Sequence, residues 1–139
     1  MSGRWHDLLR RPECGASISV LTAGLMLAAA ALLGLVIDGG AKATALNRAD
    51  ATAQEAARAG AQAATTTGGG GTLDIGPAIA AAQSYLSAAG VPGSATPAGT
   101  DSIHVTVTLT EPTKVLAMVG ISDFTATGSA DARIVYAGN

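Results

Sequence analysis

The fold is decided by residues 16–37, ASISVLTAGLMLAAAALLGLVI, a stretch that contains no charged side chain. A helix needs roughly 17–25 residues to cross a bilayer, and these about 22 residues would extend about 33 Å at ~1.5 Å per residue. Hydroxyl groups near the start of the stretch can bond back to helix carbonyls and so remain satisfied. We therefore expect a transmembrane helix here.

Two other interpretations of this stretch compete with a spanning helix. A buried core helix would need comparable apolar partners, and the chain has none elsewhere. A cleaved signal peptide could use the small-x-small site Ala41-Lys42-Ala43, but the apolar region of a signal peptide is ordinarily only about 7–15 residues long.

Because Arg4, Arg10 and Arg11 precede the stretch, the positive-inside rule predicts a single-pass plasma-membrane protein with a cytoplasmic N-terminus and an exported remainder.

The composition limits the classes of function. Hydrophobic residues make up 48% of the 139 residues, but aromatic residues only 3% and charged residues 13%, with a net charge of −2. Small side chains favour close helix–helix approach over a large core. Nucleic acid is not an expected partner, because no basic block is present. The single cysteine, Cys14, excludes an intramolecular disulfide.

The apolar helix is expected to continue outside the membrane. Ala41–Ala64 is rich in alanine, the best helix former, although Gly39 and Gly40 could end a helix before it. A continuous helix over 16–64 would be a rod of about 70 Å. Small residues at three- and four-residue spacing form a stripe, which we interpret either as a helix–helix assembly face or as one side of a solvated helix. This stripe consists of Leu46, Ala49, Ala53, Ala56, Ala57 and Gly60.

The remaining sequence predicts a linker and a small domain. Residues 65–72 include TTTGGGG, which we interpret as a flexible linker between the helix and a domain over 73–139, while residues 1–15 form a basic cytoplasmic tail. The glycines do not match a phosphate-binding loop, because no Gly-Lys-Ser/Thr follows them.

The domain over 73–139 is predicted to be α+β. Pro77 and Gly90 mark the ends of a helix, and residues 91–100 are expected to form a loop. Apolar residues alternate with polar ones over 103–110 and 124–136, which predicts a two-stranded or few-stranded antiparallel sheet with the helix across its apolar face. Between the strands, Val115–Ile121 is expected to form a short buried helical turn or, alternatively, to dock on the membrane surface or a neighbour.

Nothing in the sequence assembles a catalytic, cofactor-binding or metal-binding site. His6 and His104 are predicted to lie on opposite sides of the membrane, and neither has metal-ligand spacing to Cys14. The acidic residues of the exported part are scattered. We therefore expect no enzyme activity, no cofactor, no metal and no small-molecule substrate.

Several motifs resemble one family in their order and spacing. They are Gly15–Val20 after Arg11, Gly34–Gly40, Asn47–Ala53, Ala80–Gly90 and Pro112–Ile121. Each motif is built of common small residues, so the weight rests on their succession along most of the chain. In this respect the chain resembles a short member of the TadE/TadG-like (Flp/Tad-type) pilus-assembly proteins of bacteria.

The resemblance implies a membrane-anchored minor pilin or pseudopilin, a structural or assembly component of a Tad (Flp) pilus or related secretion system that serves cell adhesion. Its partners would be the lipid bilayer, other pilus subunits or Tad platform proteins, and further copies of itself. It also implies a prepilin-peptidase cut between Gly15 and Ala16. The chain departs from pilin-like members at the fifth mature position, where Val20 replaces glutamate. The alternative is a standalone membrane-tethered extracytoplasmic binding module outside any filament.

Overall fold

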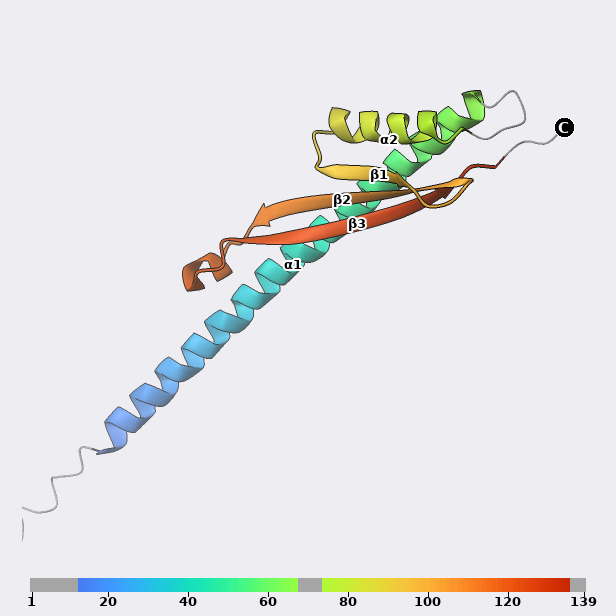
Figure 1. Cartoon of the computed structure of the whole chain (residues 1–139). Coiled ribbons are helices and arrows are strands. Elements are labelled where there is room, and N and C mark those ends of the chain that lie inside the picture. Colours follow the sequence, from blue (N-terminus) through green and yellow to red (C-terminus); the bar gives the residue numbers. More distant parts are fainter. Residues whose placement is uncertain (1–12, 68–73, 136–139) are drawn as a thin grey trace, which may run out of the picture.

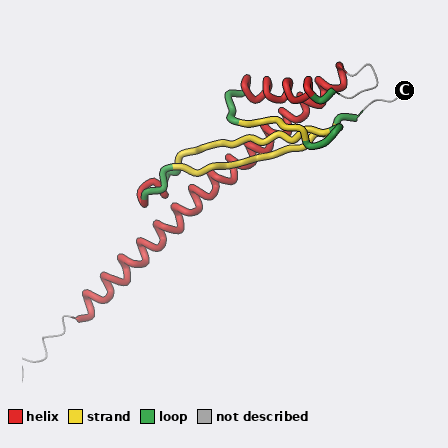
Figure 2. Tube along the Cα trace, viewed as in Figure 1, coloured by secondary structure: helices red, strands yellow, loops and turns green. Residues whose placement is uncertain are grey.

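The computed structural model describes residues 13–67 and 74–135, and it has an α+β architecture (Figures 1 and 2). One long helix carries a second helix and a three-stranded antiparallel sheet of order β1-β2-β3. The elements in chain order are α1 (Glu13–Thr67), α2 (Gly76–Ala88), β1 (Gly93–Pro97), β2 (Ser102–Pro112), the 3-10 helix η2 (Leu116–Val119) and β3 (Asp123–Arg133).

Helix α1 is unbroken through Gly39 and Gly40, so these glycines do not end it and residues 16–64 belong to one rod. Neither glycine has a positive φ angle, and the helix comprises 55 residues, or about 83 Å at ~1.5 Å per residue. It also extends over Thr65–Thr67, so the prediction that the linker begins at residue 65 is wrong. Threonine lowers helix stability by well under the ~1 kcal/mol of glycine, so three threonines can continue an established helix. Residues 68–72 of the expected linker lie outside the described residues.

The sheet rests on the second half of α1, and the two share one hydrophobic core. Strand β2 supplies the largest fully buried side chains, Ile103, Val105 and Val107, while α1 supplies mainly alanines. In Figure 1 the sheet and α2 lie beside the upper part of α1, and the lower part extends away from them. The second half of α1 is therefore part of the folded domain and not a separate helix outside it.

The two predicted strands pair antiparallel as expected, with Val107 opposite Gly128 and Ile103 opposite Ala132. Residues 93–97, expected to be loop, instead form β1 and pair with β2. The single proline of this segment, Pro97, does not prevent pairing, because β1 is an edge strand and Pro97 is its last residue. The sheet thus has three strands, which agrees with the few-stranded form of the prediction.

Helix α2 has the predicted ends. Pro77 lies in its first turn, and Gly90 follows its last residues with a φ of +65°, a left-handed conformation that glycine adopts readily. Its buried face consists of Ala78, Ala82 and Leu86 and packs against α1 and β1.

Two glycines let backbones approach closely around α1. A Cβ atom on Gly128 of β3 would lie 2.3 Å from the Asp50 backbone nitrogen and 2.4 Å from the Ala49 carbonyl carbon. A Cβ atom on Gly60 of α1 would lie 2.7 Å from the Ala78 carbonyl oxygen of α2. Because the blocking atoms are backbone atoms, no side-chain rotation can make room, and only glycine fits at these crossings.

We expect Gly128→Val to lower the free energy of unfolding by about 3 kcal/mol, the upper end of the ordinary cost of overpacking, because β3 must move away from α1. The measurement is the Tm of the full chain in detergent micelles, followed by the circular dichroism of the sheet.

The matched control is Gly39→Ala, which replaces a glycine whose Cβ would have nothing within 4 Å. Alanine in an open helix position should raise stability by roughly 0.5–1 kcal/mol. A Gly128→Val protein with the wild-type Tm would show that the crossing is not as tight as described.

Candidate functional site

The exposure of α1 changes abruptly along its length. From residue 18 to residue 37 every residue except Gly34 is exposed, including large apolar side chains such as Leu25 and Leu33. Within the described residues, α1 is the one helix that is long and apolar enough to cross a membrane, judged by length and composition. From Ala45 onward its buried side chains face the sheet and α2. We call the exposed part, residues 18–37, the apolar segment.

Asp38, the first residue after the apolar segment, binds the loop between β2 and β3. Its side chain accepts hydrogen bonds from the backbone amides of Leu116 (2.7 Å), Lys114 (2.9 Å) and Val115 (3.1 Å). The residue is only 3% exposed. One carboxylate thus satisfies three successive amides at the start of η2, as a capping residue does for the free amides of a helix N-terminus.

These hydrogen bonds favour the ionised form of Asp38, which lies outside the apolar segment. The amides of Leu116 and Lys114 contribute most to holding the pKa of Asp38 below its ordinary value; burial opposes them, and the Val115 amide and the Lys114 ammonium add smaller effects in the lowering direction. The carboxylate therefore binds the loop as an anion.

The loop that Asp38 holds was expected to be a buried turn, and that expectation is wrong. No residue of η2 is buried, and Met118 and Val119 are 86% and 73% exposed. The reason is its position: η2 lies beyond the end of the sheet and next to the apolar segment, where the core no longer reaches (Figure 1). The loop closes on itself through hydrogen bonds from Thr113 to Ile121 and Ser122.

An apolar groove of about 540 Å³ separates this loop from the apolar segment. Its two walls meet at Gly34, where a Cβ atom would lie 2.4 Å from Val115 Cγ1. The lining contains no charged residue and consists of Ala28, Ala31, Leu32, Gly34, Leu35, Val115, Leu116 and Val119. Nearer the sheet, the charged residues Arg48, Glu111 and Lys114 line a separate hollow.

The predicted small-residue stripe lies on one face of α1, but the chain's own sheet and α2 cover it. Ala49, Ala53 and Ala56 are 0% exposed, Ala57 and Gly60 are also buried, and Leu46 is partly buried. The interpretation of this stripe as an assembly face between copies is therefore corrected: its small residues admit β3 and α2 of the same chain. Helix–helix contact does occur there, between α1 and α2.

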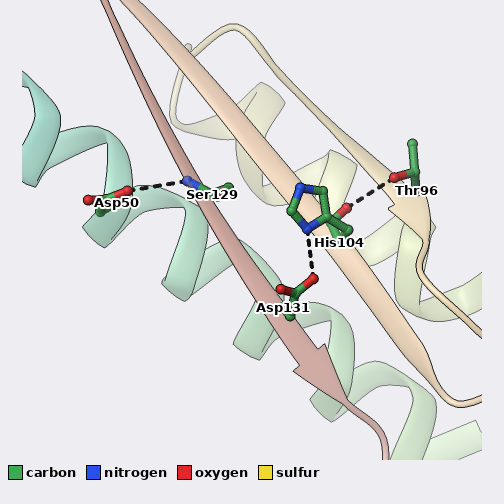
Figure 3. Close-up of polar contacts among 5 residues, drawn as sticks. All are labelled: Asp50, Thr96, His104, Ser129 and Asp131. Atoms are coloured by element: carbon green, nitrogen blue, oxygen red, sulfur yellow. Dashed lines mark hydrogen bonds and ion pairs between the residues drawn. The ribbon is translucent and has the colours of Figure 1, made fainter.

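His104 and Asp131 form a polar contact across two strands of the sheet. Figure 3 shows His104 of β2 directed toward Asp131 of β3, with 2.7 Å between Nδ1 and Oδ1. Both side chains are exposed, and such cross-strand pairs contribute at most about 1 kcal/mol. Neither His104 nor Asp131 lines one of the three hollows along α1. Within residues 13–67 and 74–135, no three His, Cys, Asp or Glu residues are grouped so as to hold a metal ion.

The remaining predicted residues lie near the start of the chain. Gly15 and Ala16, the predicted cleavage pair, fall within the first turns of α1, as does Cys14. His6 lies outside the described residues.

Sequence reasoning missed the two aspartates that join α1 to the sheet. In the sequence, Asp38 directly follows the uncharged stretch 16–37, and Asp50 lies beside Ala49 of the small-residue stripe. Asp50 accepts a hydrogen bond from the Ser129 amide of β3, 3.2 Å away, beside the Gly128 crossing (Figure 3). The available signal was their position, because each is an acidic residue in an otherwise apolar or alanine-rich helix.

Comparison of the chain with models of known protein families, with curated proteins and with solved structures gives no match.

We expect Asp38→Asn to release the loop, because the amide side chain carries no charge and places an NH₂ donor where an acceptor is needed. Hydrogen exchange of the Lys114, Val115 and Leu116 amides should become faster in the full chain in micelles. Glu55→Gln removes the same charge from an exposed part of α1 and should leave these amides unchanged. We call the three hydrogen bonds from these amides to Asp38 the carboxylate clamp. Equal protection of the amides in both variants would show that the carboxylate clamp does not hold the loop.

The clamp should also depend on pH. Because the folded pKa of Asp38 is lowered, its contribution to stability is complete above the ordinary carboxyl pKa of about 3.9 and is lost as the pH falls through the lowered value. The Tm of the wild type should therefore exceed that of Asp38→Asn at neutral pH, and the difference should disappear in acid. A difference that persists below the carboxyl range would assign the effect to another group.

Proposed function

We propose that this protein is a single-pass membrane protein that serves as a structural or assembly component of a Tad (Flp) type pilus or a related secretion system. The observation that carries the proposal is the change of exposure at Asp38 within one unbroken helix. About 20 residues before it expose apolar side chains on all sides, which is unfavourable in water and suits hydrocarbon. The residues after it bury small side chains in the chain's own domain.

The polar content of the apolar segment is compatible with a bilayer. The Thr22 hydroxyl donates to the Ile18 carbonyl at 2.8 Å, so it is satisfied within the helix. The orientation follows from Arg4, Arg10 and Arg11, which would hold the N-terminus in the cytoplasm and leave the sheet outside.

The assignment to a pilus system rests on the motif order that resembles TadE/TadG-like proteins. A helix that protrudes from its own α+β domain also suits a pilin-like subunit, because the protruding half is free to pack against other helices. With the stripe at Ala49 and Ala53 buried, contacts between subunits would fall on the apolar segment, where Leu25 and Leu33 are exposed. A subunit of this kind needs neither a cofactor nor a substrate.

The membrane arrangement predicts opposite labelling of two cysteines in intact host cells. Thr100→Cys, in a Cys14→Ser background, lies in the exposed loop before β2 and should react with a membrane-impermeant maleimide. Cys14 in the otherwise wild-type chain should react only after the membrane is permeabilised. Labelling of Cys14 alone would reverse the orientation, and recovery of the protein in the soluble fraction would contradict the membrane proposal.

The pilus assignment is tested by intact mass and by deletion. A species that starts at Ala16 among sheared filaments would indicate a processed subunit, whereas an uncleaved species in the membrane fraction would indicate an assembly factor. In either case deletion of the gene should reduce the number of pili seen by electron microscopy. Normal piliation after deletion would contradict the pilus role and favour a standalone module.

A further inference from the structure

Part of the loop Lys114–Ile121 lies beside the apolar segment, because Val115, Leu116 and Val119 line the groove against it, whereas Lys114 lies higher along α1. Val115 contacts Gly34, which is one helical turn, about 6 Å, below Asp38 along the helix axis. The groove continues past Ala31 to Ala28, one and nearly two turns further. If the apolar segment spans the bilayer, as proposed above, Val115 and Val119 therefore lie below the level at which the helix leaves the hydrocarbon.

The composition of the loop matches that depth. The seven residues VLAMVGI at 115–121 include no charge and no polar side chain, whereas Lys114 precedes them and Asp123 follows closely. Lys114 is an exposed residue, and its side chain can extend toward the lipid headgroups. An apolar tip with a cationic flank is the pattern of segments that enter the headgroup–acyl boundary by about 5–10 Å.

Most backbone amides of the loop have hydrogen-bond acceptors. An unsatisfied amide in hydrocarbon is costly, so irregular backbone enters lipid only where its polar groups have partners. Asp38 accepts from the first three amides, and the amides of Met118, Gly120 and Ile121 bond to carbonyls within the loop. In water these amides would not need a buried carboxylate from another element.

We propose that the loop Lys114–Ile121 is a second membrane-inserted element and that the groove beside it is occupied by acyl chains of the surrounding lipids. The groove is continuous with the apolar segment and its lining is uncharged, so the occupant that fits is hydrocarbon at the same depth. Insertion of the loop would fix the sheet against the membrane surface at a second point.

The test uses the full chain in phosphatidylcholine vesicles, with Trp5→Phe to remove the single native tryptophan. Single tryptophans are introduced by Val119→Trp and Met118→Trp in the loop, both at exposed positions where no core contact is lost. Leu25→Trp reports on the spanning helix, and Thr100→Trp, at the other end of the sheet, is the matched control. Lipids brominated high or low on the acyl chain quench by contact, and acrylamide quenches from water.

We expect both loop tryptophans to be quenched most by lipids brominated near the headgroup and to be shielded from acrylamide. Leu25→Trp should be quenched by lipids brominated deeper in the chain, and Thr100→Trp by acrylamide alone. Loop tryptophans quenched by acrylamide, with Leu25→Trp shielded, would overturn the insertion while leaving the membrane anchor intact. Acrylamide access to Leu25→Trp would overturn the anchor and the insertion together.

Discussion

The architecture depends on the contact between the backbones of α1 and β3 at Gly128. No side chain separates the strand from Ala49 and Asp50, so the two backbones lie closer together than any residue with a Cβ atom at position 128 would allow. The Asp50 carboxylate fixes the register of this contact by accepting from the Ser129 amide. With β3 placed there, β2 brings its large side chains over the alanines of α1, and the loop between the strands reaches Asp38.

The alanine content is explained by this contact and not by weak hydrophobicity alone. A leucine at Ala49 or Ala53 would hold the sheet away from the helix and leave voids elsewhere in the core. Each alanine buries little apolar area, so the core relies on Ile103, Val105 and Val107 for most of its hydrophobic stabilisation. The helix contributes small side chains and the strand contributes large ones. This combination allows a small domain without a disulfide to pack against one face of a long helix.

The parts of this fold that follow from local pattern could be predicted from the sequence, and the parts set by tertiary contact could not. Alanine content and the lack of proline predicted α1, and period-two alternation predicted the pairing of β2 with β3. Strand β1 was missed because its five residues show no alternation, and it forms only where the edge of β2 offers hydrogen-bond partners. The stripe on α1 was recognised as a packing face, but small residues do not reveal whether a sheet or another helix covers them. For the candidate site, the sequence located the apolar segment and the loop, but not the Asp38 contact, whose partners are more than 70 residues away.

The rigid link between the apolar segment and the domain bears on which class of function suits this protein. Helix α1 has no break at Gly39 or Gly40, and Asp38 fixes the loop to the same turn of helix. The sheet therefore has a set orientation about the helix axis. A tethered binding module benefits from a flexible connection, because a mobile domain can search a larger volume for its ligand. A subunit that packs side by side through its helix has the opposite requirement, since each domain must project at the same angle and height for contacts to repeat. The unbroken helix and the hydrogen bonds of Asp38 meet the second requirement, which supports our proposal of a subunit in an ordered assembly.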